Sequence, residues 1–145
     1  MVLFVCTGNT CRSPMAEALT RKMLAQAGVS CAVISAGISA YGASCASTHA
    51  IAVMEDEGCD LRDHRSQLFC DALAAQAKWI LAMTRGHMNA ILAACPGAAQ
   101  KTFLLNENGD INDPFGGNYE TYRQCAAQIK TYVQIWVDKI KEEGV

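Results

Sequence analysis

One segment near the N-terminus places a cysteine, an arginine and loop-forming residues at a spacing suited to anion chemistry. It reads Cys-Thr-Gly-Asn-Thr-Cys-Arg-Ser over residues 6–13, after the apolar run 2–5 and before a helix-forming stretch at 14–19. A loop between a strand and a helix delivers its backbone N–H groups to the helix N-terminus, where they and the helix dipole favour an anion. The order therefore predicts a cradle for a tetrahedral oxyanion such as phosphate, with Cys6 in its floor.

The residue types in this loop suit different parts of that task. Gly8 and Asn9 are the types that best tolerate the left-handed backbone of an anion-binding nest. Arg12 carries a planar guanidinium that can contact two phosphate oxygens at once. In that positive field we expect Cys6 to have a lowered pKa and to be largely thiolate at neutral pH.

The second candidate for chemistry is Asp113, in the segment Asp-Pro-Phe-Gly-Gly at residues 113–117. A thiolate that attacks phosphorus must expel a leaving group, and a poor leaving group needs a proton. Pro114 fixes the turn that carries the carboxylate, and the two glycines leave space around it. Glu107 and Asp110 are acids in the same stretch, but they lack this proline. We therefore expect Asp113 to be the general acid.

Alternating strands and helices must position these groups. Buried strands are predicted over residues 1–5, 31–36, 79–83 and 102–105. Further helices are predicted over residues 48–57, 71–76, 86–94 and 119–142. The order predicts an α/β fold, a single doubly wound domain over residues 1–145 with a four-stranded parallel sheet flanked by helices. Ligands of such sheets bind beyond the C-terminal strand ends, where Cys6 would lie.

Two of the helices carry end signals or a clear apolar face. Ser13 followed by Pro14 predicts the N-cap and first position of the first helix, and Gly28 predicts its end. The last helix carries apolar residues at helical spacing, which we assign to the core. They are Tyr122, Ala126, Ile129, Val133, Trp136 and Ile140.

The composition and charge of the chain argue against some classes of binding partner. The chain has 145 residues, a net charge of −2 and dispersed Lys and Arg, so no basic stripe or patch indicates nucleic acid or a membrane surface. Its apolar runs are too short to span a bilayer, and it begins without the features of a signal peptide. We expect a monomer in the cytoplasm, with neither nucleic-acid nor membrane partners.

The eight cysteines are many for a cytoplasmic protein. A domain of this size has a full core and does not need disulfides. Zinc fits no better, because Cys6 and Cys11 lack a second close pair of ligands and His49, His64 and His87 stand alone. We therefore predict no metal and no other cofactor.

With these motifs the chain resembles the low-molecular-weight protein-tyrosine phosphatase family. The resemblance covers nearly its whole length, at residues 2–19, 35–37, 63–66, 80–84 and 113–114. It implies the flavodoxin-like fold of that family and a two-step reaction. Cys6 attacks to form a phosphocysteine while Arg12 and loop amides hold the oxygens, and Asp113 protonates the leaving group. Asp113 then acts as base for the water that hydrolyses the intermediate.

The resemblance also implies roles for the other loop residues. The residues that contact the phosphoryl group or substrate would be Thr7, Gly8, Asn9, Thr10, Cys11, Arg12, Ser13 and Phe115. The family further implies that hydrogen bonds with Ser13, Ser35 and His64 support Asn9. For His64, a role in packing the loop is the alternative.

Two departures from the tyrosine-specific pattern bear on the substrate. Tyrosine-specific members usually have isoleucine where this chain has Thr10, and aromatic residues, often paired tyrosines, after the Asp-Pro, where this chain has Phe-Gly-Gly at residues 115–117. The loop and the Asp-Pro-Phe-Gly-Gly segment together look like the bacterial protein arginine phosphatase branch. The Thr10 hydroxyl could bind a guanidinium N–H, so we expect phosphoarginine in proteins as the substrate, with phosphotyrosine as the alternative.

Three further alternatives concern the cysteines. A thioredoxin-coupled arsenate reductase would typically have Gln in place of Pro14 and paired relay cysteines after the third strand, where Cys95 has no partner. A non-catalytic phosphate-binding module would gain nothing obvious from Cys6 and Asp113. Finally, Cys11 could form a protective disulfide with Cys6 under peroxide, or simply pack in the cradle wall.

Overall fold

The computed structural model of the chain describes residues 1–144. The elements follow the order β1 (Val2–Cys6), α1 (Arg12–Gln26), β2 (Val33–Gly37), α2 (Thr48–Asp56), α3 (Asp71–Gln76), β3 (Trp79–Ala82), α4 (Arg85–Ala94), the 3₁₀ helix η1 (Pro96–Lys101), β4 (Thr102–Leu104) and α5 (Tyr119–Glu143). The strands form one parallel sheet in the order β2-β1-β3-β4. This confirms the predicted α/β fold with its four-stranded parallel sheet flanked by helices.

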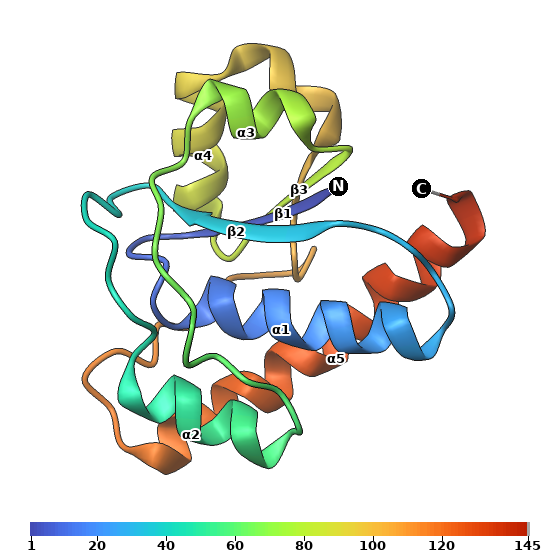
Figure 1. Cartoon of the computed structure of the whole chain (residues 1–145). Coiled ribbons are helices and arrows are strands. Elements are labelled where there is room, and N and C mark those ends of the chain that lie inside the picture. Colours follow the sequence, from blue (N-terminus) through green and yellow to red (C-terminus); the bar gives the residue numbers. More distant parts are fainter. Residues whose placement is uncertain (145) are drawn as a thin grey trace.

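Helices cover both faces of the sheet (Figure 1). Helices α1, α2 and α5 lie on one side, and α3, α4 and η1 lie on the other. Every residue of β1 is buried, and its side chains alternate between the two layers. Phe4 and Cys6 belong to the cluster with α1 and α5, whereas Leu3 and Val5 pack with α4. The alternation therefore directs the Cys6 side chain toward α1, the helix that begins six residues later.

Helix α1 starts earlier than the sequence indicated. It begins at Arg12, so the assignment of Ser13 as N-cap and Pro14 as first helical residue is wrong by two positions. The reason is that the Ser13 hydroxyl is occupied elsewhere, by Cys6 and Asn9, and caps nothing. At the other end, Gly28 has φ 72 and stops the helix as predicted.

The remaining elements lie close to their predicted positions, with two differences. Strand β2 covers Val33–Gly37 and not residues 31–36, and η1 was not predicted. The six apolar residues of the α5 stripe are all buried, which confirms their assignment to the core. No helix within residues 1–144 is both long and apolar enough to cross a membrane.

Gly37 brings the end of β2 directly against the loop that follows β1. It pairs with Cys6 in the parallel register. A Cβ atom at Gly37 would lie 2.6 Å from the carbonyl oxygen of Thr7 and 3.0 Å from the backbone nitrogen of Asn9. Both are backbone atoms that cannot rotate away, so the loop can occupy this position only because residue 37 has no side chain.

We predict that Gly37→Ala displaces the loop and destabilises the fold by about 1–3 kcal/mol, the usual range for overpacking. Urea unfolding measures the stability, and the rate of Cys6 alkylation by iodoacetamide reports on the loop. Gly42→Ala is the matched control, because nothing lies within 4 Å of its added Cβ. Equal behaviour of the two variants would show that the close approach does not constrain the loop.

Candidate active site

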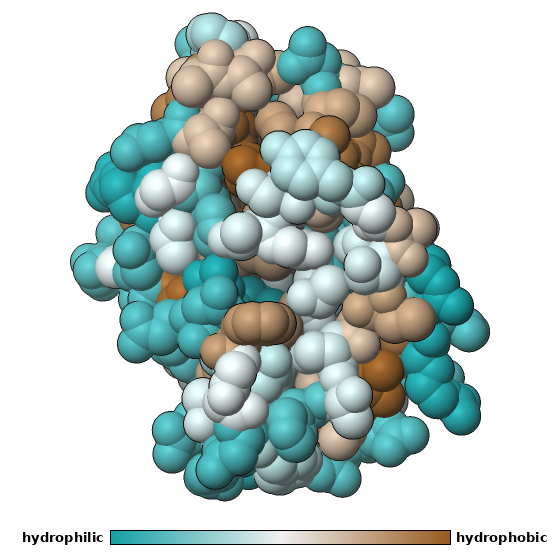
Figure 2. Space-filling model, turned by 90° about the vertical axis from the view of Figure 1, so that its left-hand side faces the viewer, coloured by the Kyte–Doolittle hydropathy of each residue, from teal (hydrophilic) through white to brown (hydrophobic). Residues whose placement is uncertain are grey.

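The loop after β1 forms one wall of a pocket at the C-terminal edge of the sheet. The pocket has a volume of about 240 Å³ and is lined by Cys6, Thr7, Gly8, Thr10, Cys11, Arg12, Asp113 and Phe115. Figure 2 faces this edge of the molecule, where mostly hydrophilic and weakly polar side chains surround a hollowed centre. The structure thus brings Asp113, which is distant in the sequence, to Cys6 and Arg12, the residues with which it was predicted to share a site.

Asn9 gives the loop its shape. It has φ 57 and is the single non-glycine residue with a positive φ among residues 1–144. Its side-chain amide donates hydrogen bonds to the hydroxyls of Ser13, at 2.8 Å, and Ser35, at 2.9 Å. Its amide oxygen accepts from the backbone N–H of Gln67 at 3.0 Å. The prediction of left-handed backbone is therefore confirmed for Asn9, but it is wrong for Gly8, whose φ is not positive.

Further side chains hold Asn9 and its serine partners. His64 Nε2 lies 2.7 Å from the Asn9 carbonyl oxygen, so a proton on Nε2 donates to it. The Ser35 hydroxyl accepts from Asn9 and donates to Glu17 at 2.6 Å, and Glu17 forms an ion pair with Arg21 at 2.7 Å. Ser13, Ser35 and His64 thus all contact Asn9, as the resemblance implied. Glu17 and Gln67 also belong to this network, and no local pattern in the sequence indicated either residue.

The same network reaches the sulfur of Cys6. Ser13 Oγ lies 2.9 Å from Cys6 Sγ. Because the amide of Asn9 can only donate to Ser13, the serine keeps its own proton free to donate to a thiolate. Asn9 therefore fixes the loop backbone and also sets the direction of a hydrogen bond to the nucleophile.

The pKa of Cys6 departs from expectation. Burial raises the pKa of the thiol above its ordinary value, since the side chain is only 3% exposed and loses its contact with water. The Ser13 hydroxyl, the backbone N–H groups of Ser13 and Asn9 and the Arg12 guanidinium all favour the thiolate, but they do not outweigh this loss. The prediction of a lowered pKa for Cys6 is therefore wrong.

Arg12 and Asp113 face the pocket as a pair. Arg12 is buried, and one of its guanidinium nitrogens donates to the carbonyl oxygen of Ile111 at 2.8 Å. Another lies 3.5 Å from Asp113 Oδ2, and Asp113 Oδ1 accepts from the backbone N–H of Phe115 at 3.0 Å. Arg12 is thus fixed by the segment that carries Asp113, and half of the Asp113 side chain stays exposed to the pocket mouth.

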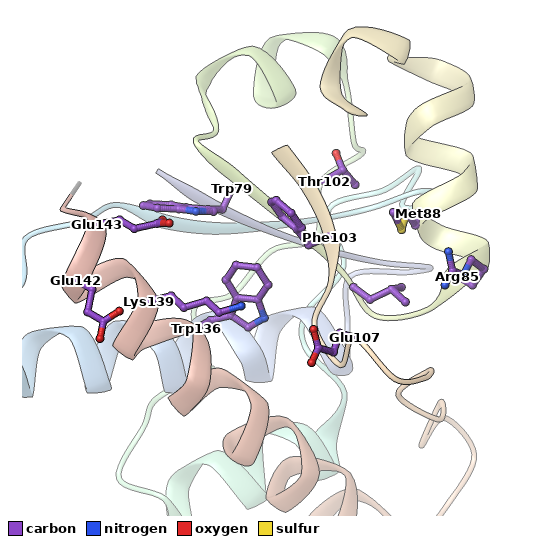
Figure 3. A pocket seen from close by; sticks show the side chains of 11 residues that line it. Trp79, Arg85, Met88, Thr102, Phe103, Glu107, Trp136, Lys139, Glu142 and Glu143 are labelled. Carbon is purple, nitrogen blue, oxygen red and sulfur yellow. The ribbon is translucent and has the colours of Figure 1, made fainter. Parts of the chain in front are cut away.

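The competing acids have other positions. Asp110 accepts from the backbone N–H of Arg85 at 2.7 Å, at the start of α4. Glu107 lines a different hollow, of about 600 Å³, between β4 and α5 (Figure 3). There Trp79 and Phe103 lie opposite Trp136, and no residue of the Cys6 loop takes part. These positions leave Asp113 as the acid in the pocket with Cys6.

Cys11 lines the pocket and also packs against side chains behind the loop. Its sulfur lies 3.3 Å from the hydroxyl of Tyr122 and 3.4 Å from that of Ser47. Burial, and then the hydrogen bond to Cys11, raise the pKa of Tyr122 to about 12. These contacts support the packing role for Cys11. Cys6 and Cys11 are both free thiols here, and the protective disulfide stays a prediction.

His87 adjoins the site, although the sequence assigned it no role. It is buried on α4, and its Nε2 lies 2.8 Å from the hydroxyl of Thr7. Burial and the nearby Arg12 lower the pKa of His87 to about 4, while Asp110 and Asp113 oppose this shift. The histidine is therefore neutral at pH 7. The one local signal was its place in the first turn of a helix after a buried strand.

We predict that Ser13→Ala raises the pKa of Cys6 further, because it removes a hydrogen bond to the thiolate. A hydrogen bond to a charged group contributes about 1.5–3 kcal/mol, so the alkylation midpoint should rise by about one to two pH units. The measurement is the pH dependence of iodoacetamide labelling, with the modified cysteine identified by mass spectrometry.

Two variants separate this effect from loosening of the loop. Ser35→Ala removes a partner of Asn9 but no contact with Cys6, so its midpoint should stay near that of wild type. Ser30→Ala, at an exposed position, controls for the substitution itself. An unchanged midpoint in Ser13→Ala would contradict the assigned hydrogen bond.

Comparison with known proteins gives matches along the whole chain. The family model described as low molecular weight phosphotyrosine protein phosphatase matches residues 1–145. A curated relative from Geobacillus stearothermophilus, named protein-arginine-phosphatase, is 42% identical and covers 98% of this chain and 97% of its own length. Another from Ralstonia solanacearum, named "Probable low molecular weight protein-tyrosine-phosphatase EpsP", is 39% identical, with 99% and 97% covered. Among solved structures, a Cys-to-Ser mutant of the YwlE arginine phosphatase with a phosphorylated active-site serine has a TM-score of 0.93 at 34% identity, with 97% and 95% covered.

Proposed function

Since the chain belongs to the low molecular weight phosphotyrosine protein phosphatase family, we propose that it hydrolyses phosphoarginine in proteins through a phosphocysteine intermediate. The observation that carries the substrate class is the placement of Thr10 and Asp113 in the pocket that contains Cys6. The relative named protein-arginine-phosphatase supports it. The proposal includes a monomeric, cytoplasmic enzyme of one domain that acts on phosphorylated proteins without nucleic-acid or membrane partners.

In the first step, Cys6 Sγ attacks phosphorus as the thiolate, after the thiol has released its proton to solvent, and the bond from phosphorus to the guanidinium nitrogen breaks. The leaving nitrogen takes its proton from Asp113. Free amides of the loop and the remaining Arg12 N–H groups hold the equatorial oxygens, where charge develops. Asp113 suits this role because it stands at the pocket mouth, 3.5 Å from the guanidinium that binds the phosphoryl group.

In the second step, a water molecule attacks the phosphocysteine and the sulfur–phosphorus bond breaks. Asp113, now ionised, removes a proton from that water. Cys6 leaves as a thiolate, and the Ser13 hydroxyl 2.9 Å away donates a hydrogen bond to it. The two steps need no group beyond the side chains and amides named, and the second restores the free enzyme.

Features of the pocket walls support the choice of phosphoarginine. Thr10 presents a hydroxyl at the pocket wall, and its nearest polar side-chain contact is Cys11 Sγ at 3.7 Å. The hydroxyl can therefore accept a guanidinium N–H. Gly116 and Gly117 supply no side chain after Phe115, so that side of the pocket stays open. An aryl ring would lack a second wall there.

Phosphotyrosine is the second candidate, and one observation favours it. Phe115 lines the pocket and is 76% exposed, so its ring is free to stack against an aromatic leaving group. The relative named as a protein-tyrosine phosphatase is nearly as similar to this chain as the one named for arginine.

We predict that wild type has a higher kcat/KM on phosphoarginine peptides than on matched phosphotyrosine peptides. Thr10→Ile should shift the ratio of the two constants toward phosphotyrosine by about tenfold or more, because it replaces a hydrogen-bonding group with an apolar one. Thr10→Ser keeps the hydroxyl and should keep the direction of the preference. A wild-type preference for phosphotyrosine would refute the assigned substrate.

We predict that Asp113→Asn lowers kcat on phosphoarginine by roughly 10²–10⁴-fold, the usual contribution of a general acid. On an aryl phosphate with an activated leaving group the first step needs no proton, so the loss in the phosphorylation rate should be about tenfold or less. Single-turnover kinetics separate the two steps. Asp110→Asn is the matched control, since its side chain binds the N–H of Arg85. Equal losses on both substrates would exclude Asp113 as the acid.

A further inference from the structure

We propose that His87 is a positioning residue, which holds the Thr7 hydroxyl as a hydrogen-bond donor to the phosphoryl group in the pocket. The proposal rests on the proposed phosphatase function of the same site, but not on the choice between phosphoarginine and phosphotyrosine. It adds a side chain from α4 to a cradle otherwise built from the loop after β1 and the segment around Asp113.

The contact between the two residues is well placed for this role. Thr7 follows the nucleophile and lines the pocket, and its carbonyl oxygen is held by the backbone N–H of Ser39 at 2.9 Å. Its hydroxyl lies 2.8 Å from His87 Nε2. The backbone of His87 is held at the start of α4, where its N–H donates to Thr84 Oγ1 at 3.1 Å. His87 itself does not line the pocket, so it acts through Thr7.

The protonation of the ring follows from its surroundings. His87 is 8% exposed and neutral at pH 7, so one of its two ring nitrogens carries a proton. Nδ1 is buried and has no hydrogen-bond partner among residues 1–144. A buried N–H without an acceptor is rarer in proteins than a buried acceptor without a donor. The proton is therefore on Nε2, which donates it to Thr7 Oγ1.

This assignment decides what Thr7 can offer to a ligand. A threonine hydroxyl has one proton to donate and two lone pairs that accept. With one lone pair occupied by His87, the hydroxyl cannot donate toward the histidine. Its proton is then available to the pocket, where a phosphoryl oxygen is the strongest acceptor that the reaction brings. With the opposite tautomer, Thr7 would donate to His87 and would present only lone pairs to the anion.

The test compares substitutions that keep or remove the donor at each position. Thr7→Val removes the hydroxyl. His87→Asn removes the donor to Thr7, because the asparagine amide occupies the place of Nδ1 and not that of Nε2. Thr7→Ser and His87→Gln are the conservative partners, since serine keeps the hydroxyl and the glutamine amide can reach the Nε2 position. The measurements are kcat/KM on both phosphopeptides and the inhibition constant of vanadate, a phosphate-like oxyanion.

We expect Thr7→Val and His87→Asn each to weaken vanadate binding and lower kcat/KM by about tenfold or more, the worth of one hydrogen bond to a charged group. The loss should be the same on both peptides, and the two conservative variants should recover most of it. The double variant should be no worse than Thr7→Val alone, because both substitutions remove one interaction. Independent losses that multiply in the double variant would overturn the proposal.

A spectroscopic measurement separates positioning from a purely structural role. In wild type, ¹⁵N NMR of the His87 ring at pH 7 should show a protonated Nε2 and an unprotonated Nδ1, and the spectrum does not depend on activity. A protonated Nδ1 would overturn the proposal. If His87→Asn fails to fold, the comparison of Thr7→Val with Thr7→Ser and the NMR measurement of the His87 tautomer still test the proposal. A wild-type preference for phosphotyrosine would reject the assigned substrate alone, since the Thr7 effect is expected on either peptide.

Discussion

The left-handed backbone of Asn9 is the constraint on which the pocket depends. This conformation is unfavourable for residues with a Cβ, so the surrounding structure has to hold it. Hydrogen bonds hold Asn9 at two groups. Its side-chain amide contacts Ser13, Ser35 and the N–H of Gln67. Its backbone carbonyl oxygen contacts His64. Since the Asn9 amide donates to Ser13, the interaction that fixes the backbone also orients the hydroxyl that serves Cys6. Shape and nucleophile stabilisation are therefore one network and cannot be altered separately at this residue.

The burial of Cys6 has opposing consequences. Removal from water raises the pKa of the thiol and so lowers the fraction of thiolate in the free protein. The same exclusion of water strengthens each remaining contact, because Coulombic and hydrogen-bond energies grow in a low local dielectric. The few donors to Cys6 do not outweigh the loss of water, so each must be placed well to stabilise the thiolate. The short contact with Ser13 and the buried guanidinium of Arg12 meet that requirement.

Sequence alone predicted what short-range patterns encode. Apolar runs, in segments that alternate with helical ones, located the strands. The proline beside Asp113 marked the acid that the structure places in the pocket. Contacts between distant segments were missed: His87 lies 80 residues from Thr7, and Gln67 lies 58 from Asn9. The predictions for the start of α1 and for the pKa of Cys6 were wrong for a related reason. A pattern of residue types shows which groups can hydrogen-bond or carry charge, but tertiary packing decides which partner a hydroxyl takes and how much water a thiol keeps.

The two threonines of the loop are supported from opposite sides of the sheet. Thr10 lies on the side of α2 and α5, where its carbonyl oxygen accepts from the N–H of Ser47 and the adjacent Cys11 meets Tyr122. Thr7 is held by His87 from α4, on the other face. In the proposed reaction, changes in one helix layer would therefore adjust the part of the pocket assigned to the leaving group, while the part assigned to the phosphoryl group keeps its support. A cradle built across the edge of a parallel sheet makes this separation possible, because its loop contacts α4 on one face of the sheet through Thr7 and the start of α2 on the other through Thr10.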